Sequence, residues 1–168
     1  MMSPSSPTGG PVDPSSLLVR ALVAYSVYEH GNEGGTATRI KLELQPRLCV
    51  LEDNGRGMGL HRAGYAESLL EQLATRQGKV ALHGLGLAII SMSSPSLTIE
   101  SRRNGTVFKQ EFAWGSARGA VQSEPWAGPT GTRITLQIAE DAPPIDFAQV
   151  LAQVDFWRSF HPGLHFEV

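Results

Sequence analysis

Cysteine is nearly missing from this sequence of 168 residues, which contains Cys49 alone and so cannot form a disulfide within one chain. Such low cysteine use is typical of a reducing compartment, and we expect a cytoplasmic location. The five histidines and the one cysteine show no zinc-ligand spacing, so no zinc site is expected. No run of about 18 apolar residues occurs, which argues against a helix that crosses a membrane.

An excess of charge of one sign is also missing. The 14 Lys and Arg residues stand against 16 Asp and Glu residues, so we expect no basic footprint for direct contact with nucleic acid. Apolar residues make up 41% of the chain, which is typical of a globular protein. Residues 1–16 are rich in Pro, Ser and Gly and lack the features of a secretory signal. They are predicted to be a flexible tail, and residues 17–168 one domain.

Hydrophobic periodicity predicts both helices and strands. Asp13-Pro14 is typical of a helix start, and the stretch from Leu17 to His30 is apolar on most sides. Asn104-Gly105 lies between two alternating runs and predicts a hairpin with a type I′ turn. The Gly- and Pro-rich residues 115–131 leave room for one irregular strand. Strands are expected at 39–44, 48–53, 97–102, 106–114, 132–138 and 164–168, and further helices at 63–76, 84–93 and after Asp146.

The order of these elements has no repeating strand–helix–strand rhythm. The predicted fold class is therefore α+β. We expect a two-layer sandwich, in which a mixed, mostly antiparallel sheet is covered on one face by helices.

The first cluster with chemical potential is Asp53-Asn54-Gly55-Arg56-Gly57, directly after a predicted strand. The carboxylate can accept a hydrogen bond from an exocyclic amine, while the glycines let a flat ring approach the backbone. The same residues also suit a tight turn closed by an aspartate, and the sequence leaves both interpretations open.

The second cluster, Leu82-His83-Gly84-Leu85-Gly86-Leu87, opens an apolar helix, where backbone N–H groups can bind an anion. It lacks the end of a Walker loop and the third glycine of the dinucleotide fingerprint, and a plain glycine-rich helix start is the alternative. In the third cluster, Gly128 to Ile134, the hydroxyl of Thr132 can reach a ligand or only satisfy a turn.

In this order, the three clusters resemble the ATP-binding domain of the type II topoisomerase B subunits, gyrase and topoisomerase IV. That domain belongs to the GHKL, or Bergerat-fold, superfamily. His83 within the glycine motif, the hairpin at 102–112, Gly131-Thr132 and the terminal segment from Trp157 to Leu164 favour the gyrase branch. The resemblance spans residues 17–168.

The resemblance implies an adenine nucleotide, ATP or ADP, as the ligand. Asp53 would accept from the adenine amino group, directly and through a water shared with Thr132. Further implied contacts are Gly55, Gly57 and Met58 beside the purine, Arg56 at the mouth, the amides of His83, Gly84, Leu85 and Gly86 at the phosphates, and the walls Val23, Leu51 and Ile134.

The first helix departs from the family, which carries a glutamate there as general base and, four residues later, an asparagine that holds Mg²⁺. In this sequence Leu22 and Ser26 occupy those positions. Leucine cannot take a proton, and the Ser26 hydroxyl, the candidate Mg²⁺ ligand, is poorer than an amide carbonyl. Glu29 and Asn32 are the nearby alternatives, but they stand three residues apart.

The segment between Gly59 and Leu82 is shorter than the family's lid, and Val80-Ala81 replaces its glycine pair. We therefore expect a stand-alone, regulatory nucleotide-binding domain with little or no hydrolysis. Its protein partner would be a topoisomerase or another DNA-maintenance protein. One alternative is a functional ATPase that uses Glu29 as the base. The other is a nucleotide-free interaction scaffold whose contact surface is residues 115–131 with Trp114 and Trp126.

Overall fold

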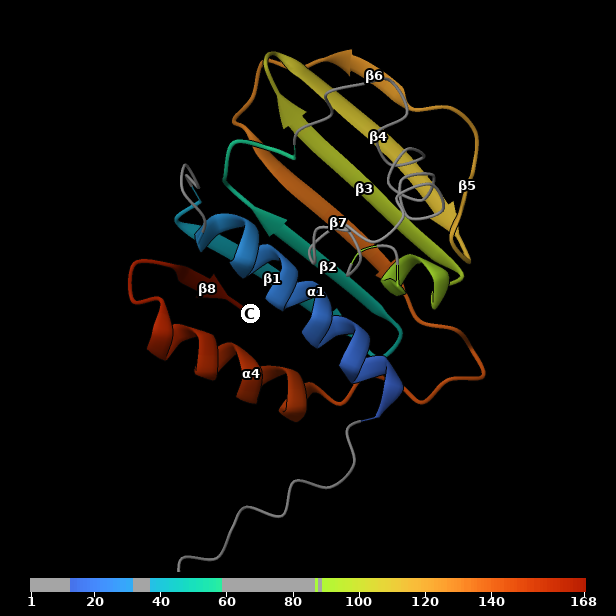
Figure 1. Ribbon diagram of the computed structural model, residues 1–168, viewed down its shortest axis with the longest axis vertical. Coiled ribbons are helices and arrows are strands. Elements are labelled where there is room, and N and C mark those ends of the chain that lie inside the picture. The colour runs from blue at the N-terminus through green and yellow to red at the C-terminus, as the bar shows by residue number, and fades with distance from the viewer. Residues whose placement is uncertain (1–12, 32–36, 59–86, 88) are drawn as a thin grey trace, which may run out of the picture.

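The computed structural model describes residues 13–31, 37–58, 87 and 89–168. The described residues form one eight-stranded sheet with helices against one of its faces (Figure 1). The elements are α1 (Pro14–Gly31), β1 (Arg39–Gln45), β2 (Leu48–Asp53), β3 (Ser96–Arg103), β4 (Thr106–Ala113), β5 (Ser116–Ala117), β6 (Gln122–Pro125), β7 (Gly131–Gln137), α4 (Phe147–Phe160) and β8 (His165–Glu167). Residues 87 and 89–92 are also helical.

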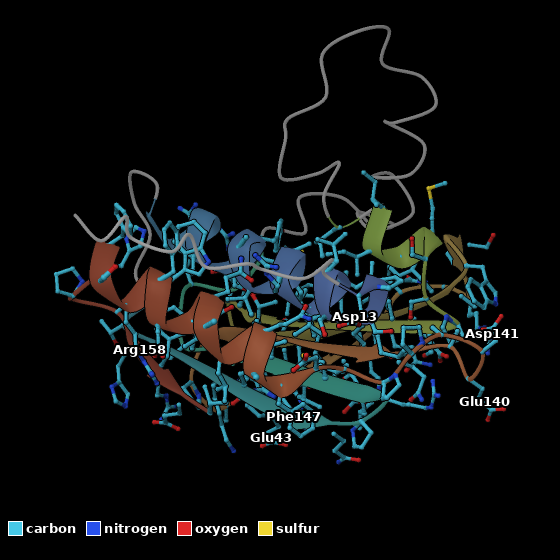
Figure 2. The ribbon with its side chains drawn as sticks, turned by 90° about the horizontal axis from the view of Figure 1, so that it is seen from below. Asp13, Glu43, Glu140, Asp141, Phe147 and Arg158 are labelled. Atoms are coloured by element: carbon cyan, nitrogen blue, oxygen red, sulfur yellow. The ribbon has the colours of Figure 1, made fainter. Side chains whose placement is uncertain are left out.

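The strands follow the order β5-β4-β3-β7-β2-β1-β8, and β6 pairs with β4 as well. Every pairing is antiparallel except that of β1 with β8. Figure 2 shows α1 on one side of the sheet and Glu43 on the other. The predicted α+β class, with a mostly antiparallel sheet and a helical layer, is confirmed.

Helix α1 forms where the sequence provides a start signal and a wide apolar surface. The carboxylate of Asp13 accepts a hydrogen bond from the Ser16 N–H at 2.8 Å, which caps the helix, and Pro14 occupies its first turn. The apolar side chains of α1 pack on the sheet, and Arg20 donates to Gln153 on α4 at 3.3 Å. The fully buried core residues of α1 are Val19, Leu22, Val23 and Val27.

Several expected boundaries differ from the observed ones. The helix starts inside the range assigned to the tail, and Ser15 and Ser16 are buried, because the Asp13 cap already begins the helix. Residues 115–131 contain two short strands instead of one, since both β5 and β6 find a partner in β4. The helix predicted at 63–76 lies outside the described residues, as do residues 84–86 and 88 of the next.

Two local signals are confirmed. Asn104 and Gly105 both have positive φ, 52° and 70°, as a type I′ turn requires. The side chain of Asp146 accepts from the backbone N–H groups of Ala148 and Gln149 and so caps α4. No helix of the described residues is long and apolar enough to cross a bilayer.

Cys49 lies on β2 within the core and is fully buried. Burial raises the pKa of its thiol to about 12. Because the folded pKa lies above the unfolded value, the associated stability is present below about pH 9 and is lost as the pH rises toward the folded pKa.

We expect a thiol reagent to label Cys49 in urea but not in the native protein at about pH 8. We also expect the unfolding free energy of Cys49→Ala to decrease less than that of the parent protein as the pH rises from about 9 to 11. Rapid labelling of the native protein would contradict the buried position.

Candidate functional site

Three polar side chains lie side by side on neighbouring strands, and we call them the polar row: Asp53, Thr132 and Ser101. Thr132 lies opposite Asp53 in the β2–β7 pair and opposite Ser101 in the β3–β7 pair. Directly opposite residues share one face, with Cβ atoms about 4.5–5.5 Å apart. All three are buried, with exposed fractions of 6%, 6% and 0%. The structure thus brings the predicted Asp53 and Thr132 together and adds Ser101, which no sequence motif singles out.

An apolar row lies next to the polar row on the same face of the sheet. It consists of Leu51, Ile134 and Ile99, each two residues from a member of the polar row and again opposite one another. Val23 of α1 belongs to the same buried core. Three of the four, Val23, Leu51 and Ile134, are the predicted walls of an adenine slot. Their place in the core accounts for their burial, so their role as walls stays a prediction.

The loop after β2 begins with a turn that the Asp53 carboxylate closes. Its Oδ1 accepts a hydrogen bond from the Gly55 N–H at 2.8 Å. The next side chain, Asn54, accepts from the backbone N–H groups of Thr38 and Arg39, both at 2.9 Å. The turn interpretation of Asp53 is therefore correct, and it does not conflict with ligand binding, because a carboxylate can accept several hydrogen bonds. Arg56, predicted at the mouth, is exposed.

Two glycines allow the loop to lie directly on the strand ends. Gly57 has φ +80°, and a Cβ added to it would lie 2.6 Å from the carbonyl oxygen of Arg102. A Cβ added to Gly131 would overlap the carbonyl oxygen of Asp53. Because both contacts are with backbone, a side chain at either position would displace the loop or a strand.

Met58, at the end of the described part of this loop, is held by the polar row through both of its peptide groups. Its N–H donates to Thr132 Oγ1 at 3.0 Å, and its carbonyl oxygen accepts from Ser101 Oγ at 2.7 Å. Its side chain packs against the core. The structure therefore fixes in place the residue that the resemblance puts against the purine.

Helix α1 buries apolar side chains together with the serines Ser15, Ser16 and Ser26. Leu22 is 0% exposed and Ser26 is 2% exposed. Magnesium prefers six oxygen ligands and is commonly bound by carboxylates and phosphates. Among the side chains that the structure describes, no group of three His, Cys, Asp or Glu residues gathers around a point. Ser26 alone does not fit a protein-held Mg²⁺ site, and we derive no step through this ion.

The opposite face of the sheet carries a charged network that includes no predicted ligand contact. Arg102 Nη2 lies 3.4 Å from Glu52, and Arg133 Nη1 lies 3.7 Å from the same carboxylate. The Arg102 guanidinium stacks 5.0 Å from the ring centroid of Trp126. Trp126 is thus engaged within the fold, whereas Trp114 is 57% exposed. Of the two tryptophans named for the scaffold alternative, only Trp114 is available as an exposed contact.

The predicted phosphate-binding residues His83, Gly84, Leu85 and Gly86 lie outside the described residues, as do Asn32 and the segment from Gly59 to Leu82. Glu29 lies in α1, but its side chain is outside the description. Leu87, directly after the glycine motif, is buried in the same core as the apolar row. Leu87 is thus the first described residue after this gap and already belongs to the core.

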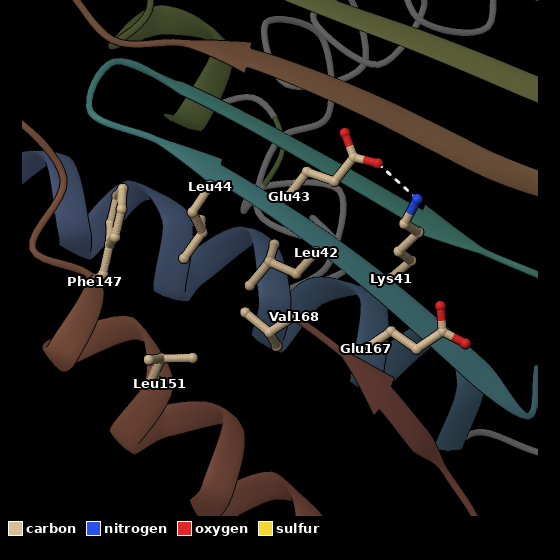
Figure 3. A pocket seen from close by; sticks show the side chains of 8 residues that line it. All are labelled: Lys41, Leu42, Glu43, Leu44, Phe147, Leu151, Glu167 and Val168. Carbon is tan, nitrogen blue, oxygen red and sulfur yellow. Dashed lines mark ion pairs between the residues drawn. The ribbon is translucent and has the colours of Figure 1, made fainter.

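A groove of about 540 Å³ lies between β1, the end of β8 and the start of α4 (Figure 3). Its apolar lining consists of Leu42, Leu44, Phe147, Leu151 and Val168. The ion pair of Lys41 with Glu43, at 2.7 Å, raises the pKa of Lys41 by a hydrogen bond and by charge attraction. This pair is exposed and contributes little stability. None of the predicted site residues lines the groove.

The chain is similar in sequence to the B subunit of DNA topoisomerase 4. The Staphylococcus epidermidis protein (strain ATCC 35984) is 32% identical over 135 residues, which cover 71% of this chain and 20% of the relative. The Staphylococcus aureus protein (strain Mu50) is 29% identical with the same coverage. The chain thus spans about a fifth of the length of these curated relatives. No protein-family model matches the chain. The predicted resemblance to the B subunit of a type II topoisomerase is confirmed as a partial sequence similarity.

The variants Gly57→Ala and Gly119→Ala separate a steric clash from backbone strain. Gly119 has φ +77° with nothing within 4 Å of an added Cβ, whereas Gly57 has φ +80° and a backbone atom at 2.6 Å. Both alanines carry the left-handed penalty, and overpacking adds about 1–3 kcal/mol at Gly57 alone. We expect urea denaturation to show that additional loss of unfolding free energy for Gly57→Ala. Equal losses would mean that the loop moves off Arg102 without cost.

Proposed function

We propose that residues 17–168 form a nucleotide-binding domain of the topoisomerase B type, with the GHKL fold, that binds ATP or ADP. The observation that carries the proposal is the polar row beside the apolar row, held under a glycine-rich loop. An apolar slot with a few placed polar groups is the usual composition of a ligand site. The similarity to the B subunit of DNA topoisomerase 4 supports the choice of an adenine nucleotide over other flat ligands.

In this proposal Asp53 accepts a hydrogen bond from the adenine amino group. Thr132 Oγ1 accepts from the Met58 N–H, and its hydrogen and second lone pair are left for the water that it shares with Asp53. Leu51, Ile134 and Val23 enclose the ring, and Met58 lies against it. The backbone N–H groups from His83 to Gly86 bind the phosphates at the helix start.

We further propose that binding regulates a partner and that hydrolysis is weak or absent. The acid position of the first helix is Leu22, which is fully buried and cannot activate water. Losing a general base alone typically lowers a rate about 10²–10⁴-fold. A topoisomerase or another DNA-maintenance protein is the partner class that the similarity favours. The cytoplasmic location stays a prediction from the low cysteine content.

Titration calorimetry with ADP and ATP, with and without Mg²⁺, tests nucleotide binding. We expect binding heat, and we expect Asp53→Asn to weaken binding by about 1.5–3 kcal/mol, the range for a hydrogen bond to a charged group. Asp146→Asn is the matched control, because asparagine caps a helix about as well as aspartate and Asp146 lies outside the polar row. No heat at millimolar nucleotide would contradict the proposal. Unchanged affinity in Asp53→Asn would leave Asp53 as a turn residue only.

A phosphate-release assay with ATP and Mg²⁺ tests the ATPase alternative. We expect no release above the buffer background, because Leu22 offers no base. Glu29→Gln is expected to leave this result unchanged. Release that disappears in Glu29→Gln would instead establish hydrolysis with Glu29 as the base.

The scaffold alternative is favoured by one observation, the exposed ring of Trp114 at the turn between β4 and β5. Trp114 has φ +51°, a conformation that bulky residues rarely adopt. A protein that binds partners through this turn without any nucleotide would show no calorimetric response to ADP. The ADP titration therefore also decides between these two functions.

A further inference from the structure

The open face of the sheet, opposite the helices, carries a row of side chains whose charges alternate in sign. Lys41 belongs to this face because it stands two residues from Glu43, which Figure 2 shows on the side away from α1. Consecutive members of the row lie directly opposite each other on neighbouring strands, from β8 to β4. We call this set the charge row, and its order is Glu167, Lys41, Glu52, Arg133, Glu100 and Lys109.

The charge row is not closed upon itself. Between its members, only Glu52 and Arg133 come within ion-pair distance among the described residues, at 3.7 Å. Lys41 pairs outside the row with Glu43, but both side chains are about half exposed, at 48% and 52%. Such exposed pairs contribute little stability. Lys109 at the end of the row is exposed as well. The row therefore presents charge of both signs, in a fixed order, to another molecule.

An alternating row with an even number of members is complementary to itself when a second copy is turned end to end. A two-fold axis that runs along the strands, between β2 and β7, makes this turn. It brings every member of one charge row opposite a member of the other charge row with the opposite sign. The facing pairs are Glu52 with Arg133, Lys41 with Glu100, and Glu167 with Lys109.

The adjacent row on the same face is compatible with this arrangement. Its middle is uncharged, with Thr135 opposite both Val50 and Thr98. The same axis places Val50 opposite Thr135 of the second copy, and Glu43 opposite Thr98 of the second copy. No like charges meet in this row. Two sheets that stack face to face keep their strands within about 30° of each other, as this axis requires.

We infer that the open face of the sheet is an interface with a second copy of this chain, in which two charge rows lie end to end across a two-fold axis. Two-fold dimers are the commonest homo-oligomers, and their interfaces must be self-complementary. Complementary charges give register and specificity more than affinity, so the dimer is weak and sensitive to salt. The inference does not depend on nucleotide binding, because the polar row lies on the other face of the sheet.

Sedimentation velocity of the full chain, at protein concentrations up to about 1 mM, tests the association. We expect a dimer at about 20 mM NaCl, where charges act over about 20 Å, and association at least about tenfold weaker at 500 mM, where they act over about 4 Å. A chain that stays monomeric at the lower salt concentration would overturn the inference. A dimer of equal strength at both salt concentrations would overturn it too, because the charge row would not be what holds the copies together.

The variants Lys109→Glu and Glu167→Lys test which charges face each other. Each variant alone places like charges at both ends of the interface, so each is expected to sediment as a monomer at low salt. Mixed in equal amounts, the two variants form a heterodimer with the parent pair at one end and the exchanged pair at the other. The dimer is therefore expected to return in the mixture.

Arg20→Glu and Glu140→Lys are the matched control, because they make the same changes of charge outside the charge row. Arg20 lies on α1 and contacts α4, and Glu140 is exposed in the loop after β7. Both variants are expected to dimerise like the parent, alone and mixed. Equal weakening in these variants and in the row variants would mean that net charge alone matters, which would overturn the inference.

Lys109→Gln and Glu167→Gln remove a charge without creating repulsion, and they keep the test available if a reversal variant does not fold. We expect each to weaken the dimer less than the corresponding reversal. Row variants that dimerise like the parent, or a mixture of the two reversals that stays monomeric, would show that the rows do not face each other and would overturn the inference.

Discussion

The register of β7 between its two neighbours is the constraint on which the candidate site depends. Side chains alternate between the two faces of a strand, so a shift of one residue would turn Thr132 away from Asp53 and Ser101. The core prevents this shift, because the inward side chains of β7 are buried between apolar partners on both sides. These triplets are Leu51, Ile134 and Ile99, followed by Cys49, Leu136 and Leu97. Apolar packing in the middle of the sheet thus sets the position of polar groups at its end.

Close backbone contacts at the strand ends are the second constraint on the candidate site. The loop after β2 reaches the end of β3 at Gly57, and β7 starts beside the end of β2 at Gly131. Glycine at both positions removes the side chain that would keep these segments apart. The loop can therefore be held by hydrogen bonds to its backbone, as Met58 is. A ligand ring beside this loop would meet a surface whose shape is set by two strands.

Signals that act within a few residues made most of the fold predictable from the sequence. The type I′ turn at Asn104-Gly105, the Asp146 cap and the alternation around Leu51 each depend on neighbours along the chain. The short strands β5 and β6 were less predictable, because they exist only through pairing with β4. Ser101 was missed for a similar reason. Its partners Met58 and Thr132 come from distant parts of the chain, and the only local signal was a serine in an apolar alternation.

The buried surface of α1 gives a physical reason why binding would outlast hydrolysis in a chain of this kind. Leu22 is fully enclosed by the core. A carboxylate at that position would need a partner or solvent, since an isolated charge in an apolar environment is strongly unfavourable. Leucine removes that requirement and adds apolar burial. The polar row lies on the sheet and does not depend on this change. The proposed purine contacts on the sheet and the activation of water from the helix therefore depend on different residues.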